Sequence, residues 1–273
     1  MHRPGRVWLL DDTAMIDLPD ASTFAVLLAD RKWLLAAAVA GLSGLVRGFS
    51  GFGGALIYMP LVAAIYDPRI AAVTLLLIDF FSSAPFTVRE LKRCNWREVL
   101  PISAAMAVAV PLGTMALVVL DPIVLRWGMA ILVLGLLAVL VSGWRYRGEP
   151  RLPITIGIGL FAGFGAGAVQ IAGPAVIIYW LSRGNTAATM RANLMVFFML
   201  CGAVIVVSYF VQGLFAADAI ALALILGVFY LTGIGIGARF FRGTSDQLYR
   251  RVAYGIIAVA ALLSLPVFDQ LRP

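Results

Sequence analysis

The sequence has few charged residues, two cysteines and a single histidine. Charged residues make up 13% of its 273 positions and hydrophobic residues 62%, whereas soluble globular chains average about 25% charged and about 45–50% apolar residues. Too few polar side chains remain to cover a soluble surface. The scarcity of charge therefore indicates an integral membrane protein with no separate soluble domain.

The cysteines and the histidine also exclude several kinds of chemistry. Cys94 lies in a basic stretch and Cys201 in an apolar one, so the sequence predicts neither a disulfide framework nor a zinc site. His2 lies before the apolar segments and leaves them no histidine proton relay. The sequence also has no Walker motif, no nucleophile elbow and no paired carboxylates within an apolar segment. We therefore expect neither an enzyme nor a bound cofactor.

The net charge of +7 comes from Lys and Arg residues in short loops between apolar stretches. Nucleic-acid binding would need these residues in a stripe or patch, so we expect no nucleic-acid partner. Positive loops are instead typical of the cytoplasmic side of a membrane protein. We expect the loops at 89–97, 145–151 and 239–251 to be cytoplasmic, and a lipid bilayer to surround the chain.

Apolar stretches long enough to span a bilayer recur along the chain. A spanning helix needs about 20 mostly apolar residues. Six uninterrupted stretches meet this length, and a short surface helix is expected at 17–31. The six stretches are 70–88, 98–120, 123–144, 187–212, 218–238 and 250–268.

Two longer stretches, 33–66 and 153–182, are interrupted near their middle by glycine-rich sequence. Each predicts two half-helices joined by irregular backbone. The cytoplasmic loops require 153–182 to enter and leave on one side, as a re-entrant hairpin. Because 44–49 also aligns with 159–164, we predict an all-α membrane fold of two inverted repeats, each a broken helix or re-entrant hairpin plus three transmembrane helices.

The repeats would cover 33–147 and 148–273, after an N-terminal surface segment at 1–32. Pro60 aligns with Pro174 in this comparison. The alternative is that both glycine-rich segments are kinked full spans, since small residues also serve helix packing in membranes. The repeats would then be parallel, and the third basic loop would lie outside, against its charge.

The first glycine-rich segment carries an arginine where a bilayer disfavours one. Arg47 would cost about 2.5–3.5 kcal/mol near the bilayer centre, so it must face protein, water or an anion. Glycine lets backbone approach a ligand, and a second half-helix starting near Gly51 would point its N–H groups at the tip. The pattern predicts an anion site around Arg47. Its other candidate residues are Gly48, Ser50, Gly51, Gly53 and Gly54.

Asp79 is the second charge that we place deep in an apolar segment. Three roles stay open for it: a structural counter-ion for Arg47, a gate that opens when the substrate arrives, and an intramembrane proton carrier. Ser82, Ser83 and Thr87 follow on the same predicted helix. They could line a pore, although hydroxyls in membrane helices usually bond their own backbone.

The second glycine-rich segment offers a comparable tip without a charge. Gln170 supplies a neutral hydrogen-bonding group, and Gly173 precedes Pro174, which suits a first helical turn. Arg191 and Asn193 follow in the next predicted helix and could line the cytoplasmic side of a path. The alternative for them is snorkelling of the arginine and a polar contact at the helix end.

These glycine-rich segments resemble the sulfite exporter TauE/SafE family of bacterial membrane permeases, over residues 33–268. The resemblance implies a secondary transporter for sulfite or a small organosulfonate, usually working in the export direction. Tyr58-Met59 and Arg47 stand where that family usually has aliphatic and small residues. The residues that carry the resemblance are Gly44-x-x-x-Gly48-Phe-x-Gly51-x-Gly53-Gly54 with Pro60 and Ala71-Ala-Val73, and Gly159-x-x-x-Gly163-Phe with Gly173-Pro174.

Other functions fit the same residues. A proton-coupled importer of a small organic anion would make Asp79 essential, and an anion channel would use the same polar tips. In a membrane-embedded assembly protein the glycines would serve packing alone. Saturable counterflow of an anion would distinguish a carrier from the last two. The sequence leaves open whether the chain forms a homo-oligomer and whether protons are coupled.

Overall fold

The computed structural model describes residues 18–50, 53–142, 151–181, 186–240 and 246–267. Within these ranges the chain forms eleven α-helices and no strand. In chain order they are α1 (Ala21–Ala29), α2 (Lys32–Ser50), α3 (Gly54–Ile65), α4 (Pro68–Glu90), α5 (Trp96–Val119), α6 (Pro122–Ser142), α7 (Leu152–Val169), α8 (Gly173–Leu181), α9 (Ala187–Val211), α10 (Ala217–Phe240) and α11 (Asp246–Leu263).

The helices predicted from the sequence are present. The six uninterrupted apolar stretches form α4, α5, α6, α9, α10 and α11, and the surface helix is α1. Both glycine-rich stretches break into two helices, α2 with α3 and α7 with α8. Five helices, α5, α6, α7, α9 and α10, are long and apolar enough to cross a membrane. The prediction of an all-α membrane fold is confirmed at this level.

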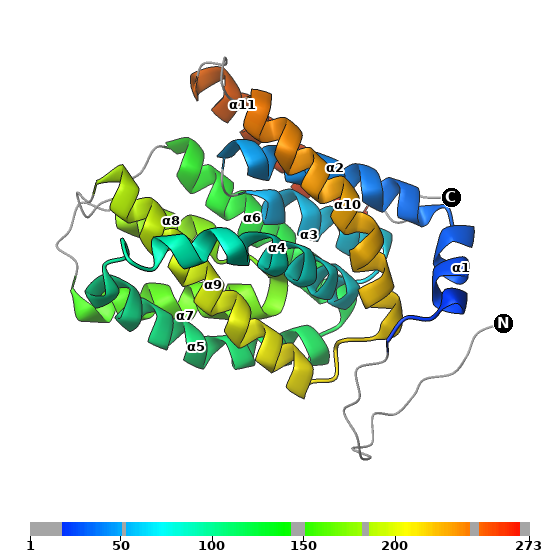
Figure 1. Ribbon diagram of the computed structural model, residues 1–273, viewed down its shortest axis with the longest axis horizontal. Coiled ribbons are helices and arrows are strands. Elements are labelled where there is room, and N and C mark those ends of the chain that lie inside the picture. Colours follow the sequence, from blue (N-terminus) through cyan, green and yellow to red (C-terminus); the bar gives the residue numbers. More distant parts are fainter. Residues whose placement is uncertain (1–17, 51–52, 143–150, 182–185, 241–245, 268–273) are drawn as a thin grey trace.

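The short helix α1 crosses the others at one end of the molecule (Figure 1). Asp20 caps its first turn, because the Asp20 carboxylate accepts hydrogen bonds from the backbone N–H and the hydroxyl of Thr23. These bonds, with a further one from Ser22, lower the pKa of Asp20 to about 2. The cap therefore persists over the whole physiological pH range.

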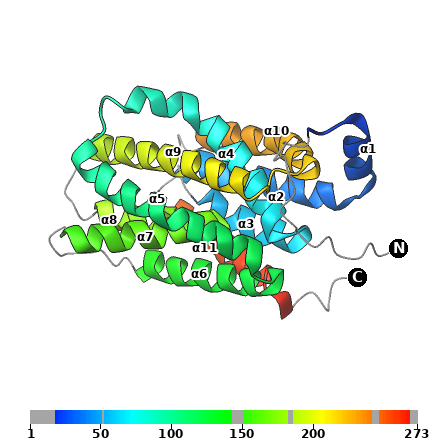
Figure 2. The ribbon, with the colours of Figure 1, turned by 90° about the horizontal axis from the view of Figure 1, so that it is seen from below.

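The long helices lie side by side (Figures 1 and 2), and hydrogen bonds between them show which ends are neighbours. The Asn193 side chain, near the start of α9, accepts a bond from the backbone N–H of Asn95, just before α5. Ser208, near the end of α9, bonds Thr114, near the end of α5. Helices α5 and α9 therefore run in the same direction. Arg69, at the start of α4, donates to backbone carbonyls at the end of α5, so α4 runs the opposite way.

Glycines set the directions of α2 and α7. A Cβ at Gly44 or Gly48 of α2 would lie only 2.1 or 2.2 Å from the carbonyl oxygens of Tyr230 and Ile234 in α10. Because residue numbers rise together on both helices, α2 and α10 are parallel and in backbone contact. Helix α7 is related to α5 in the same way, through Gly159 against Ile102 and Gly163 against Met106.

Consequently the two broken segments start from opposite ends. Helix α10 follows the end of α9 after a short loop, so α10 and its parallel neighbour α2 begin where α5 ends. Helix α4 begins there too, which means that α2–α3 returns to the end from which it started. Helices α7 and α9 both begin at the end where α5 begins. The segment α7–α8 therefore also returns to the end from which it started, which is opposite to the end of α2–α3.

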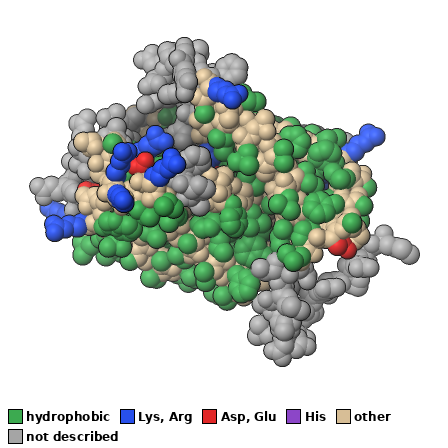
Figure 3. Space-filling view, in the orientation of Figure 1, with side chains coloured by type: hydrophobic (Ala, Val, Ile, Leu, Met, Phe, Trp, Pro, Cys, Tyr) green, Lys and Arg blue, Asp and Glu red, His purple; other side chains and the backbone are tan. Residues whose placement is uncertain are grey.

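The two ends differ in charge. We call the end where α5, α7 and α9 begin the basic end, and the opposite one the acidic end. Figure 3 shows most of the Lys and Arg side chains in view at its left, beside a wide hydrophobic surface, with a few others at the top and at the right edge. Described charges at the basic end are Arg89, Lys92, Arg93, Arg97, Arg151, Arg191 and Arg239, with Glu90 and Glu98; those at the acidic end are Asp20, Asp30, Asp67, Asp121 and Asp218, with Arg31, Lys32, Arg69 and Arg126.

One detail of the sequence interpretation is wrong. Pro174 is the second residue of α8, as expected, but Pro60 lies in the middle of α3, so the aligned prolines occupy different places. Trp180, near the end of α8, is 1% exposed and packs edge-to-face on Phe197.

The parallel glycine contacts make a prediction about stability. We expect Gly48→Ala and Gly163→Ala each to lower the thermal unfolding midpoint in detergent by several degrees, because the new methyl group would overlap a backbone carbonyl of the neighbouring helix. Overpacking of this kind costs about 1–3 kcal/mol. Tryptophan fluorescence during heating measures the midpoint.

Gly135→Ala in α6 is the matched control, because a Cβ there meets nothing within 4 Å. We expect its midpoint to equal or exceed that of the wild type, since alanine is the better helix former. Equal midpoints for all three variants would show that these helices do not hold their close packing.

Candidate functional site

A partly buried ion pair joins α2 to the middle of α4. The Arg47 Nε lies 2.6 Å from Asp79 Oδ1, and the two side chains are 19% and 30% exposed. Asp79 is the central residue of α4 (Pro68–Glu90), so the pair lies about half-way between the basic and acidic ends. The sequence-based expectation that these two charges could pair is confirmed.

Two hydroxyl groups complete this group of side chains. Arg47 also donates to Ser83 Oγ at 3.2 Å, one turn beyond Asp79 in α4. The Tyr230 hydroxyl, from α10, donates to Asp79 Oδ1 at 3.1 Å. We call Arg47, Asp79, Ser83 and Tyr230 the Arg47 cluster. It holds α2, α4 and α10 together and satisfies both charges away from bulk water.

Tyr230 was missed by the sequence analysis. It is fully buried in a helix that we treated as an ordinary span. A phenol deep in an apolar helix needs a hydrogen-bond partner, and this was the available signal. The partner itself could not be predicted, because it depends on the packing of α10 beside α2.

The N-terminus of α3 lies against the Arg47 cluster. Gly53 precedes it with a left-handed backbone (φ 93°) and provides no side-chain cap. A Cβ on Gly54 would lie 3.0 Å from the Tyr230 hydroxyl and 3.1 Å from the Arg47 Cβ. The unpaired N–H groups of a first helical turn carry partial positive charge. A guanidinium and a helix N-terminus therefore adjoin, which is a combination suited to an anion.

The remaining predicted residues of this tip have different positions. Helix α3 begins at Gly54, not near Gly51, and Gly51 lies outside the described residues, as does the side chain of Ser50. Gly48 faces the backbone of α10 at close range. Its lack of a side chain is therefore used for helix packing. Gly53 and Gly54 are the two glycines that the structure places beside Arg47.

Hydrogen bonds fix α3 against its neighbours. The Tyr58 hydroxyl donates to Thr74 Oγ1 at 2.9 Å, and the Thr74 hydroxyl donates back to the Ile70 carbonyl in its own helix. The Tyr58 ring also packs edge-to-face on Tyr230, with centroids 6.3 Å apart. Tyr58, one of the departures from the family pattern, thus links α3 to α4 and α10.

The second break is built from neutral groups. Gln170 follows α7 in a left-handed conformation (φ 57°), the one such residue other than glycine in the described ranges. Its side-chain amide donates to the Tyr209 hydroxyl at 3.4 Å, which in turn donates to the Gly167 carbonyl at 2.9 Å. Gly173 then begins α8 beside Phe198. Sequence reasoning predicted a hydrogen-bonding Gln170 but missed its partner Tyr209.

Arg191 and Asn193 lie at the basic end, in the first turns of α9. The buried Asn193 accepts a bond from the Asn95 backbone and donates to Glu98 at 3.4 Å, so it ties α9 to α5. Arg191 is exposed. The structure thus places these two residues apart from the Arg47 cluster, which lies at the middle of α4.

Other polar side chains within the helices support the structure locally. Ser82 and Thr87 donate to carbonyls of their own helix, which leaves Ser83 as the hydroxyl of this group that joins the Arg47 cluster. Arg126, which the sequence analysis did not single out, is 8% exposed and donates to the Ser264 carbonyl. It fastens α6 to the end of α11 near the acidic end.

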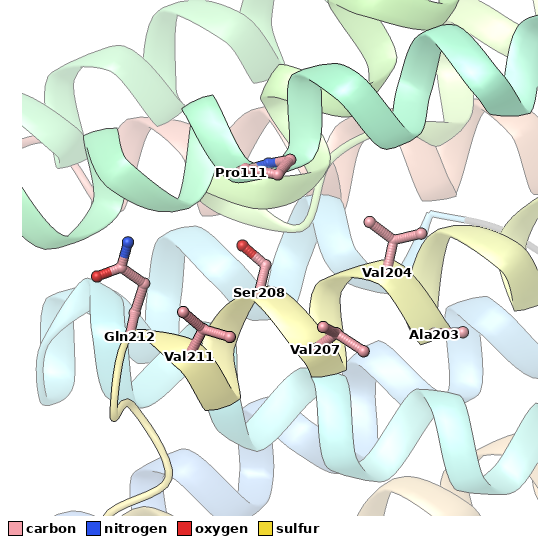
Figure 4. A pocket seen from close by; sticks show the side chains of 7 residues that line it. All are labelled: Pro111, Ala203, Val204, Val207, Ser208, Val211 and Gln212. Atoms are coloured by element: carbon pink, nitrogen blue, oxygen red, sulfur yellow. The ribbon is translucent and has the colours of Figure 1, made fainter. Parts of the chain in front are cut away.

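A hollow of about 460 Å³ lies between α5 and α9, away from the Arg47 cluster. Figure 4 shows Ser208 and Gln212 as the polar groups among otherwise apolar lining side chains. Ser208 already bonds Thr114, and no lining residue carries a charge. This hollow does not have the chemistry of an anion site. Its lining residues are Pro111, Ala203, Val204, Val207, Ser208, Val211 and Gln212.

Comparison with known proteins places this arrangement in a family. The family model described as Sulfite exporter TauE/SafE matches residues 36–264, from the first part of α2 to the end of α11. Searches of curated proteins and of solved structures each give no significant match. The match covers both broken segments, the Arg47 cluster and all five candidate spans. The chain therefore belongs to the sulfite exporter TauE/SafE family and is a multi-pass membrane transporter.

Proposed function

We propose that this protein exports a small anion, sulfite or a small organosulfonate, across the bacterial inner membrane. The observation that carries the proposal is the Arg47–Asp79 ion pair beside the N-terminus of α3. Arg47 provides a cation half-way through the molecule, and the Asp79 carboxylate pairs with it as an anionic substrate would. An anion that takes the place of the Asp79 carboxylate binds where the protein already stabilises negative charge.

The proposal includes two inverted repeats with re-entrant hairpins. Its support is the direction of the helices: α2 and α4 begin at the acidic end, and α7 and α9 at the basic end. Two kinked full spans would instead have placed the starts of α2 and α4 at opposite ends. Discontinuous helices whose tips meet mid-membrane are how many secondary transporters build a substrate site.

Close packing of helices from different repeats suggests which parts move. Helix α2 packs most intimately with α10, and α7 with α5, so the sequence halves cannot separate without breaking these contacts. We infer that α2, α4 and α10 move as one unit against α5, α7 and α9. These units meet where α4 crosses α9, and a Cβ at Gly202 would lie 2.4 Å from the Phe80 ring. Each unit carries one of the two hydrogen-bonded tips.

The charge at the two ends supports a cytoplasmic basic end. Positive residues near span ends are retained in the cytoplasm, and the described cations gather where α5, α7 and α9 begin. An inside-negative potential is worth about 2.3 kcal/mol per charge per 100 mV, so an anion leaves the cell downhill without a coupling ion. Export is therefore the direction that the proposal assigns.

Counterflow in proteoliposomes tests the proposal. The purified protein is reconstituted and loaded with sulfite, and uptake of labelled sulfite is compared with uptake of a two-carbon sulfonate, acetate and chloride. We expect saturable, trans-stimulated uptake of the two sulfur oxyanions. Flux that rises linearly with concentration would identify a channel, and exchange confined to acetate would show that the substrate is a carboxylate.

The native Cys94 reports the orientation in the same preparation. It lies at the basic end, in the loop before α5, whereas Cys201 is 4% exposed. Burial raises the pKa of the Cys94 thiol, with a further contribution from Glu98, so its reaction with a membrane-impermeant maleimide accelerates as the pH rises above the ordinary thiol range. In intact cells Cys94 should stay unlabelled until the inner membrane is opened. Labelling before that step would reverse the proposed orientation.

A further inference from the structure

Ser43, like Ser103 in α5, differs from most hydroxyl-bearing residues of the described helices. Its Oγ is fully buried, and no described residue accepts or donates a hydrogen bond to it. Hydroxyls in membrane helices usually donate to a carbonyl three or four residues earlier. Eight others here do so, to the carbonyls given in brackets: Thr74 (Ile70), Ser82 (Asp79), Thr87 (Ser83), Thr114 (Val110), Ser142 (Val139), Thr155 (Arg151), Thr232 (Val228) and Ser264 (Ala261).

Ser43 lies beside the Arg47 cluster. It precedes Arg47 by four residues in α2, so both side chains lie on one face of that helix. A Cβ on Gly54 would lie 3.1 Å from the Ser43 carbonyl oxygen and 3.1 Å from the Arg47 Cβ. The backbone of Ser43 and the side chain of Arg47 therefore both adjoin the first residue of α3. The unused hydroxyl belongs to the residue one turn before Arg47 on this helix.

Three kinds of hydrogen-bond donor thus converge at the junction of α2 and α3. Arg47 contributes N–H groups that Asp79 and Ser83 now accept. The first turn of α3 contributes backbone N–H groups, since Gly53 has no side chain to cap them. Ser43 contributes a hydroxyl whose burial without a partner is unfavourable. A ligand that accepts from all three would satisfy donors that the protein itself leaves partly unused.

We infer that Ser43 is a further substrate ligand, and that it favours an anionic head group with three oxygens. This inference rests on the proposed function and adds to it the atoms that bind the substrate's oxygens. When Asp79 leaves Arg47, a sulfite or sulfonate group offers one oxygen each to Arg47, to Ser43 and to the first turn of α3. A carboxylate has only two oxygens, which lie in one plane, and cannot present a separate oxygen to each of the three donors, so Ser43 discriminates between the two classes of anion.

Ser43→Ala tests this inference in the counterflow assay. We expect the KM for sulfite and for the two-carbon sulfonate to rise about tenfold or more, the loss typical of one hydrogen bond to a charged group. The kcat should stay within about twofold, and inhibition by acetate should change little. Because alanine removes an unsatisfied hydroxyl, we expect the thermal midpoint without substrate to be unchanged or higher.

Ser103→Ala is the matched control. Ser103 also has a buried Oγ without a described partner, at 6% exposure, but it lies in α5 near the basic end. Its KM should match the wild type. If Ser43→Ala retains wild-type KM values, or if Ser103→Ala changes KM equally, Ser43 is not a substrate ligand. A wild-type protein that exchanges none of these anions would instead overturn the proposed function itself.

Discussion

Arg47→Ala should reduce sulfite counterflow about 100-fold or more, the loss expected when a buried charge that binds a charged partner is removed. The guanidinium is the described cation that lies beside the middle of α4, where it pairs with Asp79 at 2.6 Å. The neighbouring N-terminus of α3 provides only partial positive charge. Without Arg47 the site would have to hold an anion through backbone N–H groups and hydroxyls alone.

Folding must be separated from function in this experiment. Removing Arg47 leaves the Asp79 carboxylate buried without its counter-ion, which typically costs about 3–5 kcal/mol. The double variant Arg47→Ala/Asp79→Asn avoids this penalty, because it removes both charges. We expect the double variant to keep a wild-type elution profile and thermal midpoint and still to lack flux.

Arg191→Ala is the control for a change of net charge, because Arg191 is exposed at the basic end. Its flux should stay within about twofold of the wild type, as for most surface substitutions. Arg47→Lys keeps the charge but loses the forked donor geometry, so we expect it to have intermediate activity. Wild-type flux in the folded double variant would remove Arg47 from the substrate path.

The sequence predicted the Arg47–Asp79 pair because a bilayer leaves few alternatives for a charge in mid-span. Two opposite charges deep in apolar segments must find partners, and each was the best partner available to the other. The opposite directions of the two hairpins stay a prediction, which rests on the basic loops because these restrict which ends can share a side. These inferences used constraints that act on the whole chain and do not depend on side-chain packing.

The remainder of the site depends on packing that local sequence does not contain. Tyr230 reaches Asp79 because α10 lies parallel to α2 in backbone contact. No feature of the sequence 218–238 predicts that α10 packs against α2. The same packing explains Gly48. Close approach of the backbone to a ligand and close approach to a neighbouring helix both require glycine, so the sequence does not distinguish them. Gln170 and Tyr209 likewise meet only in the folded chain.

Asp79→Asn should tighten the binding of sulfite about tenfold while lowering its turnover. In the structure the Asp79 carboxylate pairs with the Arg47 guanidinium. We propose that the substrate binds this same guanidinium, so the carboxylate competes with the anion. An asparagine keeps the shape and can still accept a hydrogen bond from Tyr230, but it competes weakly because it is neutral. The apparent Kd equals the intrinsic Kd divided by the fraction of protein with a free guanidinium, so a carboxylate that occupies about nine-tenths of the protein weakens binding about tenfold.

The same exchange explains why turnover should fall. If Asp79 returns to Arg47 as the anion leaves, re-pairing of the two charges offsets the free energy of releasing the substrate. The asparagine variant lacks that contribution, so the tightly bound anion dissociates slowly and exchange becomes limited by release. Tryptophan fluorescence titration measures the Kd, and counterflow at saturating sulfite measures kcat.

Two comparisons decide what the carboxylate does. Asp121→Asn at the exposed start of α6 is the control, because asparagine caps a helix as well as aspartate and the Asp121 side chain accepts a bond from the backbone N–H of Ile123. An unchanged sulfite Kd in Asp79→Asn would show that the ion pair is structural and opens nowhere in the cycle. Flux driven by a membrane potential without a pH gradient separates the two other roles: a gate slows this flux in the variant, whereas wild-type rates combined with loss of pH-driven uptake would identify Asp79 as the proton carrier of an importer.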